Sequence, residues 1–168
     1  MADRTVENPG TEVPQMPEIL ERVLLYAINE GKQKMLEAEE VTPFTSLVVH
    51  ESVFIETHPG NDAEECFNLA RHTVEGARGA SAYAFCYDGY IETSEGVKDA
   101  LISEGGVPGG VDGYAIGLLY TLDADGKPQF SESPSYIGKA PNFMSDLRDA
   151  TEYADEEIDD KYTDTLTD

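Results

Sequence analysis

The sequence predicts an α+β protein with a mainly antiparallel sheet of about five strands and two main helices. Three observations support this fold class: an apolar period typical of a helix after Pro17, a second helical pattern after Asp62, and strand-like runs that follow one another through short turns. Strands joined in this way pair antiparallel, and helices then cover one or both faces of the sheet. The expected order is α-β-β-α-β-β-β, with a short C-terminal helix as an option.

The first helix is predicted from Glu18 to about Glu39. Pro17 suits the start of a helix, and Glu18 and Glu21 complement the helix dipole in the first turn. Apolar residues recur at steps of three and four, which indicates one buried face. These residues are Leu20, Val23, Leu24, Ala27, Ile28, Gly31 and Met35.

The second helix is predicted to begin at a cap formed by Asn61 or Asp62. Glu64 or Glu65 is placed to complete a capping box. Its inward face is expected to carry Cys66, Phe67, Ala70, Thr73, Val74 and Ala77. Gly79 is expected to end the helix, because glycine commonly follows the last helical residue.

Two short strands are predicted before the second helix, Phe44–Val49 and 53–55, joined by a tight turn; one bulged strand is the alternative. The most sheet-like stretch is 80–103. There, 81–87 is expected to form a hairpin with 90–93 through Asp88-Gly89, because Asp-Gly readily takes the positive φ of a tight turn. The run 100–102 is then expected to form a third strand of this sheet.

The later part of the chain alternates loops and strands. Residues 104–113 hold five glycines and a proline, which predicts a long mobile loop. Tyr114–Leu122 is apolar on both faces and is expected to be a central strand. A turn at 123–126 and a short strand at 129–131 follow, and 134–142 is expected to be irregular.

The domain organisation follows from these patterns and from charge. Residues 1–16 are expected to be a flexible arm, 17–140 a single α+β domain, and 141–168 an acidic segment that is partly disordered. Residues 146–168 contain ten acids and two bases. A short helix could begin near Met144.

The net charge of −23 comes from 34 acidic and 11 basic residues. Such a field repels phosphate backbones and anionic lipid, so nucleic-acid and membrane partners are not expected. It would suit a basic protein partner, divalent ions or a high-salt interior, and solubility alone is the simplest explanation. The sequence has no secretory signal and no apolar run of membrane-spanning length, so a soluble, cytoplasmic protein is expected.

No motif establishes a catalytic or cofactor site, and no cofactor is expected. His58, Asp62 and Cys66 step by four residues and are the candidates for a metal site, although zinc normally needs closer ligand pairs. Cys66 with His72 is the candidate thiol–base pair. Both cysteines are expected to be free thiols, with a disulfide between Cys66 and Cys86 as the alternative.

Three further patterns have simple structural explanations. The glycine-rich stretch 104–113 lacks the spacing of a phosphate-binding loop. Asp123-Ala124-Asp125-Gly126 resembles the start of a calcium loop, yet strand-like flanks favour a hairpin turn. Tyrosines concentrate in the sheet half, where they could pack in the core or line a protein interface. They are Tyr83, Tyr87, Tyr90, Tyr114, Tyr120 and Tyr136.

The stretches Ala82–Tyr90 and Lys98–Glu104, preceded by Leu69-Ala70-Arg71, resemble small bacterial α+β proteins without assigned activity. That resemblance implies a fold and brings no catalytic residues. The order of elements is also similar to that of roadblock-type domains, which dimerise and act as adaptors. The function expected from the sequence is a non-catalytic interaction module, as a homodimer and with a basic partner. The alternative is a small metal- or thiol-dependent hydrolase.

Overall fold

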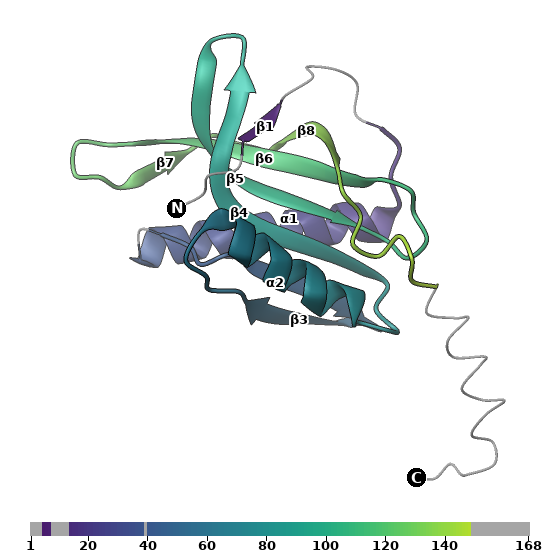
Figure 1. Cartoon of the computed structure of the whole chain (residues 1–168). Helices are drawn as coiled ribbons and strands as arrows, with labels where there is room; N and C mark the ends of the chain where they lie inside the picture. The colour runs from purple at the N-terminus through teal and green to yellow at the C-terminus, as the bar shows by residue number, and fades with distance from the viewer. Residues whose placement is uncertain (1–4, 8–13, 39, 149–168) are drawn as a thin grey trace, which may run out of the picture.

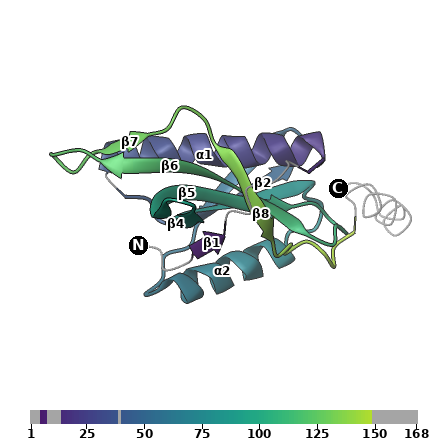
Figure 2. The same cartoon turned by 90° about the horizontal axis from the view of Figure 1, so that it is seen from above.

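A sheet forms the middle layer of the protein, with helix α1 (Glu18–Ala38) on one face and helix α2 (Ala63–Glu75) on the other (Figures 1 and 2). The computed structural model describes residues 5–7, 14–38 and 40–148. Its strands are β1 (Thr5–Glu7), β2 (Phe44–Val49), β3 (Ser52–Thr57), β4 (Ala82–Thr93), β5 (Gly96–Gly106), β6 (Gly113–Leu122), β7 (Pro128–Phe130) and β8 (Ser135–Ala140).

The strand order confirms the α+β class and the antiparallel sheet. Six strands follow one another in the order β3-β2-β4-β5-β6-β7, while β1 pairs with β4 and β8 pairs with β6. Every pairing is antiparallel except that of β1 with β4. The described residues contribute eight strands to the sheet, so the expectation of about five was too low.

Helix α1 confirms the first predicted helix, and its buried residues are the seven of the predicted apolar face. They pack on the alternate residues of the sheet that point to this side, among them Phe44, Ala84 and Leu101. The other face of the sheet packs against Ala70 and Val74 of α2. Alternation of side chains along each strand therefore builds two apolar clusters from one sheet.

Helix α2 begins as predicted and ends earlier. Asp62 is the N-cap: its Oδ1 accepts a hydrogen bond from the Glu65 N–H at 2.8 Å. Glu65 Oε1 in turn accepts from the Asn61 N–H at 2.8 Å, which completes the capping interaction. The helix ends at Glu75 with Gly76 as the C-cap, so the prediction that Gly79 ends it was wrong.

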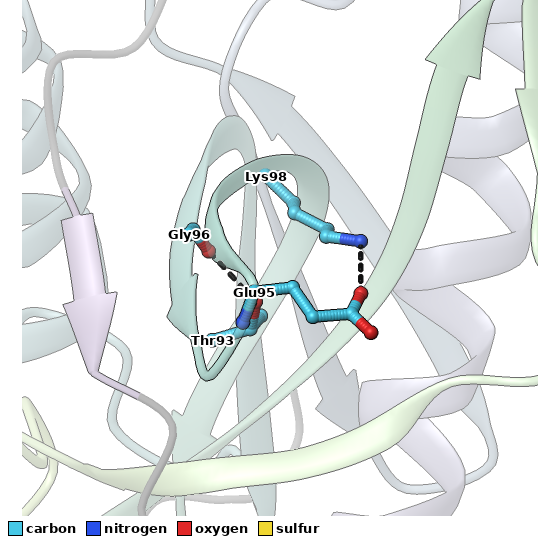
Figure 3. Close-up of polar contacts among 4 residues, drawn as sticks. All are labelled: Thr93, Glu95, Gly96 and Lys98. Atoms are coloured by element: carbon cyan, nitrogen blue, oxygen red, sulfur yellow. Dashed lines mark hydrogen bonds and ion pairs between the residues drawn. The ribbon is translucent and has the colours of Figure 1, made fainter.

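The predicted turn at Asp88-Gly89 was wrong, because β4 runs straight through it. Strand β4 pairs with β5 over eleven residue pairs, from Tyr83↔Gly106 to Thr93↔Gly96. The turn lies at the far end of this hairpin, where Gly96 has φ +112° (Figure 3). Thr93 Oγ1 accepts from the Glu95 N–H at 3.1 Å and donates to the Gly96 carbonyl at 2.7 Å. Lys98 bonds Glu95 across the turn at 2.8 Å.

Two regions expected to be irregular are ordered. Strand β5 continues through Gly105 and Gly106, so the glycine-rich loop is shorter than predicted. The rest of the glycine-rich loop is held by Asn142, whose Nδ2 donates to the carbonyls of Val107 at 2.9 Å and Gly110 at 2.8 Å. The stretch 135–140, predicted to be irregular, is strand β8 and pairs with β6.

Other predictions for the sheet are confirmed. Strands β2 and β3 form a hairpin, and His50 in its turn has φ 58°. Strand β6 is central, between β5 on one side and β7 and β8 on the other. The expectations for the N-terminal arm and the acidic C-terminal segment fall mostly on residues 1–4, 8–13 and 149–168, which lie outside the described residues.

Candidate functional site

The three residues predicted as metal candidates lie around the start of α2 and have separate roles. His58 is 3% exposed, and its Nε2 is hydrogen-bonded to Thr45 Oγ1 at 3.0 Å. Asp62 caps helix α2, and Cys66 is a buried residue of that helix. Within residues 5–7, 14–38 and 40–148, no group of three His, Cys, Asp or Glu side chains could hold a metal ion.

Both cysteines are free and buried, and burial makes them weak nucleophiles. Burial raises the pKa of the Cys66 thiol, and the carboxylates of Glu65 and Asp62 raise it further. Burial, followed by the charge of Asp88, raises the pKa of the Cys86 thiol much more. His72 lies in the last turn of α2 and is exposed, six residues after Cys66, so the two do not share a helix face. A reactive cysteine thiolate requires a partly exposed site near positive charge, whereas both of these thiols are buried.

A lowered pKa of His58 predicts a specific loss of stability in acid. Burial lowers this pKa from its ordinary value of 6.5, against a smaller opposing effect of Glu56. As the pH falls below about 6.5, the unfolded chain takes up a proton at His58 before the folded chain does. The free energy of unfolding should therefore decrease through this window, by at most about 1.4 kcal/mol per pH unit from this group.

Urea unfolding at pH 7 and pH 5 measures this effect. The His58→Gln variant, which carries no titratable ring, should lose less stability between the two pH values than the natural chain. The His72→Gln variant is the matched control and should behave like the natural chain, because His72 is exposed. An equal pH dependence in the natural chain and in His58→Gln would contradict the assignment.

Two carboxylates on the sheet, one buried and one half-buried, accept hydrogen bonds from tyrosine hydroxyls. Glu104 on β5 is 1% exposed, and its Oε2 accepts a hydrogen bond from the Tyr87 hydroxyl at 2.5 Å. On the opposite face, Asp88 Oδ1 accepts from the Tyr120 hydroxyl at 2.6 Å. Burial raises the pKa of Asp88, and burial with the nearby carboxylate of Asp88 raises the pKa of Tyr120. Tyr120 therefore stays protonated near neutral pH and serves as a donor.

Three surface grooves are lined by described residues. The first, of about 600 Å³, lies between the start of β5 and the β6–β7 hairpin and includes Asp99 and Tyr120. The second, of about 490 Å³, lies between α2 and residues 141–147. The third, also about 490 Å³, lies over Ile91, Leu119 and Ile137. None of these three grooves is lined by a histidine, a cysteine or Glu104.

The second groove contains a stacked arginine. The Arg71 guanidinium lies 5.4 Å from the ring centroid of Phe67 and 6.0 Å from that of Phe143. Glu75 and Asp146 also line this groove, so its charge is mixed. The contacts are those of a cation packed on aromatic faces, and they join α2 to the segment after β8.

The turn at Asp123–Gly126 is the predicted hairpin turn, between β6 and β7. Asp123 Oδ1 accepts from the N–H groups of Asp125 at 2.8 Å and Lys127 at 2.9 Å. Gly126 has φ +81°, as such turns require. The carboxylate of Asp123 is thus used within the turn.

Exposed large apolar side chains occur on several elements, and the longest consecutive run of them among the described residues lies on β3. Of the six tyrosines in this half of the chain, Tyr83, Tyr87 and Tyr120 are buried in the core, whereas Tyr90 is 39% exposed. All six residues of β3 are exposed, and three consecutive apolar residues lie at its centre: Val53 at 37%, Phe54 at 56% and Ile55 at 38%. In the sequence, the signal for this surface is a run of β-branched and aromatic residues without charge. The same run is also typical of a strand in the core, so it does not predict exposure.

No protein-family model, curated protein or solved structure matches this chain. The resemblances given by the sequence are therefore still predictions. Neither helix of the described residues is long and apolar enough to cross a membrane.

Proposed function

We propose that the chain is a non-catalytic protein–protein interaction module that binds through the β3 edge. The observation that carries this proposal is the exposure of Val53, Phe54 and Ile55 on a strand that pairs with β2 alone among the described strands. An edge strand offers unpaired N–H and C=O groups to another strand, and proteins usually protect it with charge, proline or a bulge. The centre of β3 has none of these.

The net charge supports a basic protein as the partner. A chain with 34 acidic and 11 basic residues attracts a basic protein and accelerates its encounter, and salt screens this attraction. We propose that the module works as a homodimer and binds a basic partner protein. Glu51 and Glu56 flank the apolar centre of β3 and belong to the acidic surface that a basic partner would contact.

The proposal is tested by affinity capture, in which the full-length chain is used to retain proteins from a lysate of the source cells. Two matched variants of the chain are compared with the natural chain. Phe54→Lys places a charge at the centre of β3. Val97→Lys makes the same charge change at another exposed apolar residue, 59% exposed on β5. Basic proteins retained by the natural chain should be lost with Phe54→Lys and at high salt, and kept with Val97→Lys. Capture that is equal with both variants would overturn the proposal.

A further inference from the structure

The pairing of β2 with β3 fixes which backbone groups of β3 face outward. The register runs from Val49↔Ser52 to Phe44↔Thr57, and the His58 N–H donates to the Pro43 carbonyl at 2.8 Å. Hydrogen-bonded and non-hydrogen-bonded pairs alternate in an antiparallel ladder. The even-numbered residues of β3 therefore bond to β2, and Val53, Ile55 and Thr57 direct their N–H and C=O groups away from it.

Apolar side chains lie on both faces of this edge. Phe54 is paired with Leu47, which packs in the cluster beneath α2, so Phe54 lies on the α2 side of the sheet. Val53 is paired with Val48, which packs in the cluster beneath α1, so Val53 and Ile55 lie on the α1 side. A strand added at this edge would cover apolar surface on both faces and would satisfy the outward backbone groups.

We infer that the strand added here is β3 of a second copy of this chain, paired antiparallel about a two-fold axis at Phe54; the inference rests on the proposed function. In this register Val53 lies opposite Ile55 of the second copy, and both have outward-facing backbone groups. The two residues exchange both hydrogen bonds, and the symmetry repeats this pair once. Phe54 lies opposite itself in a non-hydrogen-bonded pair, where side chains approach most closely.

Apolar matching selects this register, because only here does each of Val53, Phe54 and Ile55 lie opposite another apolar residue. Two chains of net charge −23 repel each other, so the contact must keep acidic residues apart. With Phe54 on the axis, Glu56 lies opposite Ser52 and Glu51 lies opposite Thr57, so no acid faces an acid. A shift of two residues in one direction sets Glu51 opposite Ile55, and in the other direction Glu56 opposite Phe54. Only the central register pairs apolar with apolar and acid with neutral residues along the whole strand.

Sedimentation of the full-length chain at a series of concentrations and salt concentrations tests the inference. Ile55→Pro removes the outward N–H at the centre of the contact, and an edge strand tolerates proline where the N–H faces solvent. Phe54→Lys adds a charge next to its own copy. Both variants should weaken the dimer by about tenfold or more, and Val97→Lys should leave it unchanged. The natural dimer should tighten with added salt, because the repulsion between two acidic chains is screened.

The outcomes separate the inference from the proposed function. A chain that stays monomeric up to its solubility limit, while Phe54→Lys still abolishes capture of a basic partner, would overturn the second copy and retain the interaction module. A dimer unchanged by Ile55→Pro and Phe54→Lys would overturn the β3 contact. If capture is also unchanged, the proposed function fails with it. Circular dichroism and thermal unfolding of each variant show that a loss of dimer is not a loss of fold.

Discussion

Replacement of Gly105 by alanine is expected to lower the free energy of unfolding by about 3 kcal/mol or more. Gly105 lies in the middle of the sheet, paired with Ala84 on one side and Tyr114 on the other. A Cβ at this position would overlap the carbonyl group of Tyr83. The obstacle is backbone in a central strand, so it cannot be relieved by turning a side chain, and the ladder between β4 and β5 must shift.

Thermal and urea unfolding of Gly105→Ala and Gly76→Ala form the test. Gly76 is the matched control, because a Cβ there would meet only helix carbonyls at 3.7 and 3.8 Å. The midpoint of thermal unfolding should fall by roughly 6 to 12 °C for Gly105→Ala and change little for Gly76→Ala. Similar midpoints for the two variants would show that β4 and β5 do not approach as described.

Replacement of Asn142 by alanine is expected to lower the free energy of unfolding by about 2 to 3 kcal/mol. Besides its two bonds to the glycine-rich loop, the Asn142 side chain accepts from the Met144 N–H at 2.9 Å. Asn142 is 8% exposed, and its removal leaves the half-buried Val107 and Gly110 without this donor for their carbonyls. The segment after β8 would also lose its main attachment to this loop.

Urea unfolding and amide hydrogen exchange measure this effect together. Exchange should accelerate at Gly109, whose N–H donates to the Met144 carbonyl at 3.0 Å. Asn68→Ala, at an exposed position of α2, is the control and should leave both measurements almost unchanged. Retention of Gly109 protection in Asn142→Ala would contradict the role given to this side chain.

The helices were predictable because each signal is local. The apolar period of α1 names its buried face, and Asp62 with Glu65 marks the start of α2 through contacts three residues apart. The β2–β3 hairpin and the β6–β7 turn were predictable for the same reason. Only the end of α2 was misplaced, since Gly76 and Gly79 are both plausible after Glu75 and Arg78 respectively.

The central hairpin was not predictable because distant residues decide it. Asp88-Gly89 normally turns a chain, but here β5 pairs along the whole of β4, and the Tyr120 hydroxyl from β6 binds Asp88. Gly105, Gly106 and strand β8 were missed because glycine and proline usually mark loops. Their positions depend on contacts such as that of Asn142 with Val107, which join residues 35 apart in the sequence.

The candidate site was only partly predictable. Sequence spacing placed Cys66 on an inward helix face, and it is buried there. Spacing says nothing about the role of His58, which lies just after β3 and is hydrogen-bonded to Thr45 of β2. The exposure of Val53, Phe54 and Ile55 depends on strand order alone, since the same residues in a central position would be core. Only the placement of β3 at the edge of the sheet turns this apolar run into a candidate surface.

Oxidative cross-linking of the full-length Phe54→Cys variant tests the β3 contact most directly. In the proposed register the two residues at position 54 face each other as a non-hydrogen-bonded pair, with Cα atoms about 4.5 Å apart, which a disulfide can span. The native thiols, Cys66 and Cys86, are buried and should not react. We expect a disulfide-linked dimer for Phe54→Cys and none for Val97→Cys. A Phe54→Cys chain that stays monomeric under oxidation, or links no faster than Val97→Cys, would contradict the β3 contact.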